Sequence, residues 1–263
     1  KHTATNRDIQ IAVIQTPKIS NFTDFDALAY EPDVAVRFVK PGEPIGTPDL
    51  VVLPGSKNTI ADLTYLYEQG YADEIKALSA SGVPVLGVCG GNQMLGTVIY
   101  DPEHMEGDVD EMKGLGLLPT ATTMKGTKTT HQVEFDAKEL MFLGEPYSGT
   151  GLRGYEIHMG DTVPTGEATR CFNIKTRSEQ PVDVIDGFIT TDGNVMGTYI
   201  HGILDNDGLR RHIINGLRKR KGLELLPEVF HYFEHKNASY DRLADIVEKH
   251  LDMDYIDRIV GLK

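Results

Sequence analysis

The sequence contains no tryptophan and only two cysteines, Cys89 and Cys171. Two cysteines in 263 residues exclude a disulfide framework and a cysteine-rich metal cluster. The chain also lacks an apolar run near the roughly 18 residues that span a membrane, and no signal-peptide pattern opens it. We therefore expect a cytoplasmic protein that holds no metal in this chain.

Positive charge is scarce. There are 26 lysines and arginines against 39 aspartates and glutamates, which gives a formal net charge of −13 and excludes nucleic acid or an anionic membrane as the main partner. The P-loop pattern G-x-x-x-x-G-K-[ST] is also absent, so we expect no ATP-dependent activation of a carboxylate by this chain alone. A hydrophobic content of 40% over this length is enough for one large α/β domain.

The first hundred residues alternate between strand-like and helix-like segments. Short branched runs at 9–15, 34–39 and 50–53 predict buried strands, and helical patterns follow in 54–70 and 72–81. Strands separated by helices imply a parallel sheet with helices on both faces. In such a sheet, ligands bind at the carboxyl ends of the strands.

From about Lys113 to Ile203 the segments become strand-like and rich in glycine, which predicts an antiparallel extension of the same sheet. The fold class we expect is α/β, with a mostly parallel central sheet flanked by helices. Because the chain does not begin with methionine, we interpret residues 1–8 as a linker or remnant of a longer chain and 9–263 as one domain. The tail from about residue 237 has apolar residues at helical spacing and is expected to pack on the domain.

One glycine pattern is not interpreted as a nucleotide site. Residues 149–154 (GTGLRG) match G-x-G-x-x-G, but they lead into the strand-like YEIHM at 155–159 and not into a helix. A mobile or tightly turned loop is the better interpretation.

Cys89 stands where a short apolar strand meets a helix expected over 92–100. The sequence Gly87-Val88-Cys89-Gly90-Gly91 is typical of a nucleophile elbow, in which glycines allow the strained turn that presents the reactive atom. A helix start also favours a thiolate. The alternative is a small buried hydrophobic residue, which is our interpretation of Cys171 within a strand pattern.

A thiol nucleophile needs a base that later protonates the leaving amine, and histidine suits both steps. His201 is the best placed of the nine histidines because it ends the apolar segment NVMGTYI at 194–200. His158, inside GYEIHMG, is the second candidate and a possible assisting residue.

Four motifs, which in chain order are LPGSKNT, GVCGGNQMLG, GYEIHMG and GTYIHGILDND, resemble those of the class I glutamine amidotransferases. The likeness is greatest to the glutaminase domains of cobyric acid synthases, whose opening resembles IAVIQTPKISNFTDFDAL, and it extends from about Ile9 to the tail. The resemblance implies a flavodoxin-like sheet. It also implies that Cys89 attacks the side-chain amide of glutamine, with His201 as its base.

Further roles follow from the resemblance alone. Backbone N–H groups of Gly55 and Gly90 would form the oxyanion hole. Gln93 and Ser56 would line the substrate pocket. The family's triad glutamate, two residues after the histidine, is replaced here by Ile203.

The replacement at 203 leaves the orienting carboxylate open. Glu156 and Asp205 are candidates, although Asp205 is equally explained as part of a helix cap with Asn206 and Asp207. A Cys–His pair without a third member also functions if a backbone carbonyl holds the imidazole.

The resemblance implies L-glutamine as substrate and an upstream ATP-dependent synthetase domain as partner. That domain would use ATP and Mg²⁺ to amidate carboxylates of cobyrinic acid a,c-diamide, a corrinoid, in cobalamin biosynthesis. Three alternatives remain: a stand-alone glutaminase subunit of a cell-wall amide ligase, a cysteine hydrolase of another amide, and a non-catalytic scaffold that retains the elbow.

Overall fold

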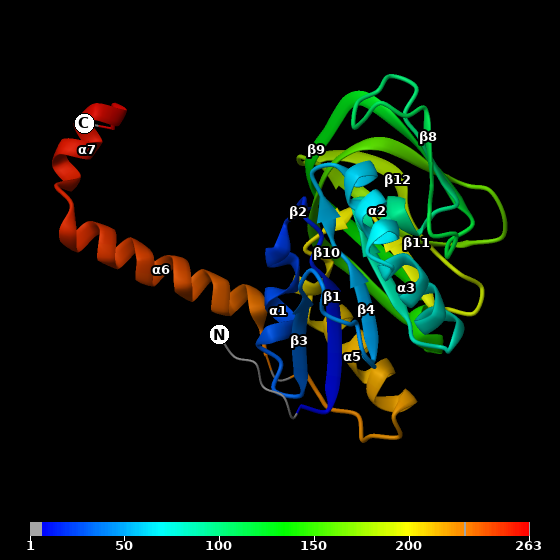
Figure 1. Cartoon of the computed structure of the whole chain (residues 1–263). Coiled ribbons are helices and arrows are strands. Elements are labelled where there is room, and N and C mark those ends of the chain that lie inside the picture. Colours follow the sequence, from blue (N-terminus) through cyan, green and yellow to red (C-terminus); the bar gives the residue numbers. More distant parts are fainter. Residues whose placement is uncertain (1–6, 229, 263) are drawn as a thin grey trace.

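Five parallel strands form the centre of the sheet in the computed structural model, which describes residues 7–228 and 230–262 (Figure 1). Their spatial order is β13-β6-β4-β1-β3. The bounds are β1 Ile9–Ile14, β3 Val34–Val39, β4 Leu50–Leu53, β6 Val85–Val88 and β13 Val195–Thr198. The expected parallel centre is confirmed.

An antiparallel half continues the same sheet beyond β13 in the order β12-β11-β9-β10-β14. It is dominated by the long β9–β10 hairpin, whose register shifts several times. The bounds are β9 Thr120–Leu140, β10 Tyr147–Pro164, β11 Thr169–Arg177, β12 Gln180–Ile189 and β14 Ile200–His201. Shorter pairs are formed by β7 Val98–Tyr100 with β8 Glu111–Lys113, and by β2 Ile19–Ser20 with β5 Gly55–Ser56. The antiparallel extension is therefore also confirmed.

Helices cover both faces of the parallel centre. One face packs against α2 Thr59–Glu68, α3 Tyr71–Ala80 and α4 Gly90–Leu95, and the other against α1 Asp26–Ala29 and α5 Asp207–Arg220. Short 3-10 helices are η1 Phe22–Phe25, η2 Phe142–Gly144 and η3 Ile203–Asp205. Strand β1 shows why two cores form: Ile11 and Val13 belong to one cluster and Ala12 and Ile14 to the other, as a period of two requires.

The helix expected over 92–100 is wrong in its bounds. The helix α4 begins at Gly90 and ends at Leu95, because Gly96 takes an extended conformation with ψ of 178°. The β-branched residues that follow then form strand β7.

The tail does not pack on the domain as we expected. It forms two helices, α6 Tyr232–His250 and α7 Met253–Val260, and Figure 1 shows α6 running away from the sheet with α7 at its far end. Helical spacing shows that one face is apolar but does not show what covers that face. No helix within 7–228 and 230–262 is long and apolar enough to cross a membrane.

The linker expected at residues 1–8 lies mostly outside the described residues, which begin at Arg7. Arg7 itself is tied to the domain, because its guanidinium donates to the carbonyl oxygens of Glu31 and Val34, at 2.7 Å each.

Candidate active site

Cys89 occupies a strained turn between strand β6 and helix α4. Its backbone angles are φ 54° and ψ −109°, a region that residues with a side chain rarely adopt. The turn is held because the Cys89 N–H donates to the carbonyl oxygen of Thr198 on β13 at 2.8 Å. The thiol donates to the carbonyl oxygen of Ile157, with an S···O distance of 3.6 Å. The structure therefore places Cys89 on an elbow, as its glycine neighbours indicate.

The two glycines after Cys89 are explained by close packing. A β-carbon on Gly91 would lie 2.0 Å from the carbonyl oxygen of Leu53, so any side chain there would displace strand β4. A β-carbon on Gly90 would lie 2.9 Å from the backbone nitrogen of Ser56. Gly90 and the Gly55–Ser56 turn therefore lie against each other, next to the cysteine.

His201 lies on β14 beside a carboxylate that our sequence analysis did not identify, that of Asp24. Nδ1 of His201 is 2.6 Å from Oδ2 of Asp24, and Oδ1 of Asp24 accepts the N–H of Gly202 at 3.1 Å. The exposed fractions are 0% for His201 and 4% for Asp24. An ionised carboxylate only accepts hydrogen bonds, so it holds the proton on Nδ1 and leaves Nε2 for chemistry.

Aromatic and amide groups support this pair. The ring of Tyr155 stacks on the imidazole of His201 with a centroid distance of 5.0 Å and an angle of 15°. Its hydroxyl accepts from Nδ2 of Asn21 at 2.8 Å, which fixes the segment that carries Asp24. The sequence did contain a signal, since Asp24 lies in the stretch NFTDFDAL that carried part of the family resemblance.

The pKa of His201 is strongly perturbed. Burial lowers it, but hydrogen bonding to Asp24 and interaction with Cys89 outweigh burial and raise it to about 10. Nε2 is buried without a hydrogen-bond partner among the described residues. Catalytic hydrogen bonds are often long before the substrate is bound. The site thus holds an imidazolium close to a cysteine, with one ring nitrogen available for proton transfer.

Glu156 does not contact His201. Residues alternate across strand β10, so Tyr155 pairs with His201 while Glu156 pairs with Ile200 and faces the other way. Its carboxylate accepts two hydrogen bonds from Arg177, at 2.7 and 2.9 Å. Burial raises the pKa of Glu156, but the interaction with nearby His158 and the hydrogen bonds from Arg177 outweigh burial and lower it.

Asp205 is neither the partner of His201 nor the helix cap that we expected. Asp205 is the last residue of η3, and the N-cap of α5 is Asn206. The Asn206 side chain makes no capping hydrogen bond, because it is hydrogen-bonded to the backbone of Arg153. Burial raises the pKa of Asp205 to about 7, with the charge of nearby Lys236 opposing the shift.

The thiol side of the elbow opens into a cavity of about 360 Å³. The lining side chains include Ser56, Cys89, Gln93, His158 and three charged residues, Lys57, Glu106 and Lys128. The Gln93 amide is held at both ends, since it accepts from Thr59 at 2.8 Å and donates to the carbonyl oxygen of Met159 at 2.8 Å. The cavity therefore contains a nucleophile together with charged side chains of both signs. We call Lys57, Glu106 and Lys128 the charged rim of the cavity.

Two of the expected pocket residues have structural partners as well. The hydroxyl of Ser56 donates to Oδ2 of Asp62 at 2.6 Å, so it shapes the turn as well as lining the cavity. His158 stacks on Tyr199 with a centroid distance of 3.8 Å. All three charged residues were missed from the sequence: Lys57 lies in the motif LPGSKNT but was given no role, and Glu106 and Lys128 lie in no motif.

Three other sequence features lie away from this chemistry. Residues 149–154 open no helix, as we predicted, but the loop that we expected there is wrong, because the segment lies within strand β10. Cys171 is buried in β11, and burial raises the pKa of its thiol well above the usual range. Within the described residues, no group of three or more histidine, cysteine, aspartate or glutamate side chains has the arrangement of a metal site.

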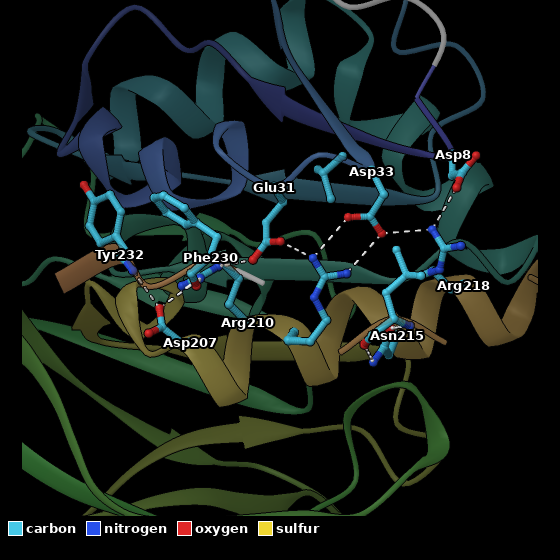
Figure 2. Close-up of polar contacts among 12 residues, drawn as sticks. Asp8, Glu31, Asp33, Asp207, Arg210, Asn215, Arg218, Phe230 and Tyr232 are labelled. Carbon is cyan, nitrogen blue, oxygen red and sulfur yellow. Dashed lines mark hydrogen bonds and ion pairs between the residues drawn. The ribbon is translucent and has the colours of Figure 1, made fainter. Parts of the chain in front are cut away.

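A buried ion-pair network fixes the segments that carry Asp24 and His201 (Figure 2). Nε of Arg210 donates to Glu31 at 2.7 Å, Arg211 pairs with Glu31 and Asp33, and Nη1 of Arg218 lies 2.9 Å from Asp33. The two acids follow the Asp24 segment, and the three arginines lie on α5, which follows His201. Removing one member of such a buried pair typically costs about 3–5 kcal/mol, so the two segments are firmly joined.

Residues 10–209 match the model of the CobB/CobQ-like glutamine amidotransferase domain. The chain belongs to this family. As an amidotransferase domain it resembles the cobyric acid synthase of Moorella thermoacetica, with 46% identity over 257 residues. The synthase of Citrobacter koseri is 45% identical over 255 residues. Each alignment covers 97% of this chain and 49% of the relative, so the amidotransferase domain spans about half the length of the curated relatives it matches.

Solved structures agree on the fold. The amidotransferase domain matches the structure of PurLQS from Thermotoga maritima with a TM-score of 0.57 and 18% identity, over 81% of this chain and 99% of that chain. A structure described as a glutamine amidotransferase matches with a TM-score of 0.51 and 16% identity, over 79% of this chain and 98% of that chain. At these identities the likeness shows the fold alone.

Proposed function

We propose that this chain is the glutaminase half of a cobyric acid synthase. It hydrolyses L-glutamine through Cys89 and supplies the ammonia to an ATP-dependent half. The observation that carries the proposal is the buried Asp24–His201 pair placed beside a strained cysteine that lines a cavity. A nucleophile, a base and an orienting acid are the parts that acyl transfer needs.

The first step forms a thioester. With the thiol proton on His201, the Cys89 sulfur attacks the side-chain carbonyl carbon of glutamine. The carbonyl oxygen becomes an oxyanion that accepts hydrogen bonds from the N–H groups of Gly90 and Gly55, which lie on either side of the turn at Ser56. The imidazolium then gives its proton to the amide nitrogen. The C–N bond breaks and ammonia leaves.

The second step regenerates the enzyme. Neutral His201 removes a proton from a water molecule, which attacks the thioester carbon. The C–S bond breaks, glutamate leaves with its new carboxyl proton released to solvent, and the site returns to the starting state of a Cys89 thiolate and a His201 imidazolium. Asp24 keeps the proton on Nδ1 throughout and stabilises the imidazolium in both steps.

The charged rim supports a free amino acid as substrate. Glu106 can pair with the α-ammonium group of glutamine, and Lys57 and Lys128 with its α-carboxylate. Burial raises the pKa of Glu106, although backbone N–H groups of Ile60 and Thr59 partly offset burial. A peptide-bound glutamine has neither of these charged ends, so the rim favours the free amino acid over a peptide.

The partner, the acceptor and the compartment are parts of the same proposal. The relatives that match nearly all of this chain are cobyric acid synthases of about twice its length, which supports a second half that uses ATP and Mg²⁺. The acceptor is then a carboxylate of a corrinoid, and the reaction takes place in the cytoplasm. The alternative partner, a cell-wall amide ligase, would amidate a different carboxylate.

Labelling with a diazo-oxo analogue of glutamine tests the nucleophile. We expect modification of Cys89 and none of Cys171, because Cys89 lines the cavity at the elbow, whereas burial raises the pKa of the Cys171 thiol on a different strand. Peptide mass spectrometry locates the label.

Steady-state kinetics of His201→Ala should show a loss of turnover on the order of 10²–10⁴-fold, whereas the matched variant His158→Ala should mainly raise KM. Equal labelling of both cysteines, or normal turnover by His201→Ala, would sink the proposal.

A further inference from the structure

The two C-terminal helices form an arm, residues 232–262, with an uncovered apolar face. Figure 1 shows the arm leaving the body of the domain. Large apolar side chains more than half exposed recur along it at helical spacing: Tyr240, Leu243, Ile246, Leu251, Tyr255, Ile259, Val260 and Leu262. An amphipathic helix normally buries such a face, and a contiguous exposed patch of this kind marks an interaction site.

The root of the arm is held firmly, so the uncovered face has a defined position. The N–H of Tyr232 donates to Asp207 at 2.9 Å, and Arg210 donates to the carbonyl oxygen of Phe230 at 2.8 Å (Figure 2). The ring of Tyr30 stacks on Phe230 with a centroid distance of 5.1 Å. Through Arg210 the root joins the buried ion-pair network that fixes the Asp24 segment.

We infer that the arm is the docking element for the ATP-dependent half, which binds along its apolar face. The inference rests on the proposed function, since it names the surface by which that function engages its partner. The partner surface would be an apolar groove or helix face of the synthetase half. The arm would hold that half against the domain by burying the exposed side chains of α6 and α7.

The extent of the two sequence matches supports this occupant. The family model ends at residue 209, before the arm begins. The alignment with the synthase of Moorella thermoacetica covers 97% of this chain and must therefore include most of the arm. The arm is thus shared with proteins that carry a second half, and it lies outside the part that defines the amidotransferase domain.

A second copy of this chain fits the arm less well. Each copy carries a formal net charge of −13, so bringing two copies together costs electrostatic free energy. The apolar face also extends over two successive helices, which are joined at Leu251–Asp252. Such a pair of helices can contact a large partner along its whole length. The synthetase half, about as long as this chain in the relatives, provides such a partner.

Photo-crosslinking in the full-length synthase that contains this chain tests the inference directly. A photoreactive amino acid replaces Leu243 or Ile246 on the arm, and in matched controls it replaces Val163 or Ile185, which are exposed apolar residues on β10 and β12. We expect arm positions to crosslink to peptides of the ATP-dependent half and the controls not to. Crosslinks between two arms, crosslinks to the domain's own body, or no crosslink would overturn the inference.

A charge variant gives the functional readout. Leu243→Asp with Ile246→Asp should lower glutamine-dependent amidation at least tenfold while ammonium-dependent amidation and Cys89 labelling stay within twofold of wild type. The control pair, Val163→Asp with Ile185→Asp, should leave all three unchanged. Unchanged glutamine-dependent amidation in the arm variant would contradict the inference. If Cys89 of the wild type is not labelled at all, the proposed function is contradicted. Failure of the docking inference and failure of the proposed function are therefore distinguishable.

Discussion

The imidazole of His201 is bonded to one carboxylate and lies close to one thiol, and these two neighbours determine its chemistry. Oδ2 of Asp24 accepts from Nδ1 of His201 at 2.6 Å, and Oδ1 accepts from the N–H of Gly202 at 3.1 Å. We propose that Asp24 is the third member of a catalytic triad, the role that the family resemblance gives to a glutamate two residues after the histidine. On this proposal, Ile203 at that position does not leave His201 without an orienting carboxylate.

Replacing this carboxylate should slow the chemistry and leave binding largely intact. For Asp24→Asn we expect kcat for glutamine hydrolysis to fall on the order of 10²-fold or more, because the amide no longer enforces the Nδ1–H tautomer or stabilises the imidazolium. KM should change little, since Asp24 does not line the cavity. The matched control is Asp205→Asn, a partly buried carboxyl on a neighbouring segment, which should retain most of the turnover.

The same pair should make stability depend on pH. The folded-state pKa of His201 is raised from 6.5 to about 10 by Asp24 and Cys89 against the opposing effect of burial. A raised pKa contributes stability that is fully present below about pH 6.5 and is lost as the pH rises toward 10. The Tm difference between wild type and Asp24→Asn should therefore be largest near pH 6 and shrink by about pH 10. Thermal melts across this range measure it, and a difference that grew with pH would contradict the assignment.

At the residue scale, the sequence identifies the groups whose local pattern has a chemical meaning and misses those whose role depends on a distant partner. Cys89 and His201 stand out because glycines and an apolar strand mark their positions. Asp24 is separated from His201 by 177 residues, and its partner is set by how η1 and β14 meet in the fold. Glu156 was the reasonable local candidate, but the two-residue period of a strand turns it away from His201.

At the element scale, the turn at Gly55–Ser56 and helix α4 form one unit. We expect Gly90→Ala to lower kcat on the order of 10-fold to 10²-fold, because a β-carbon 2.9 Å from Ser56 pushes apart the two groups that face the oxyanion. Gly107→Ala is the control, since its β-carbon would have 3.8 Å of space beside Ile60. Steady-state kinetics measures the loss of catalysis, and urea unfolding measures any loss of stability. Equal reductions of kcat in Gly90→Ala and Gly107→Ala would contradict the packing argument.

Elements with strong patterns were predictable and others were not. The first three parallel strands agree with expectation within one residue at each end, because short branched runs bounded by turn residues have few alternatives. The hairpin of β9 and β10 is polar and rich in glycine along its exposed length, so its register could not be deduced. The arm has a clear helical pattern, yet its position depends on contacts that periodicity does not encode.

At the scale of the whole molecule, the proposed function predicts that ammonia release is coupled to the acceptor half. We expect the isolated chain to hydrolyse glutamine slowly, and addition of the ATP-dependent half with nucleotide and corrinoid to raise the rate about tenfold or more. A complex carrying Cys89→Ser should fail to amidate the corrinoid with glutamine but succeed with ammonium. Product analysis with each nitrogen donor measures this. Failure of ammonium to support synthesis by a folded variant would refute the division of labour.

The buried arginines of α5 have a consequence for how the protein is made. Glu31 and Asp33 precede Arg210, Arg211 and Arg218 by about 180 residues and therefore leave the ribosome before them. Until α5 has left the ribosome, the acids next to the Asp24 segment lack their partners and the histidine itself is missing for most of that time. The site is therefore complete only after helix α5 has followed His201 out of the ribosome, late in the synthesis of the domain.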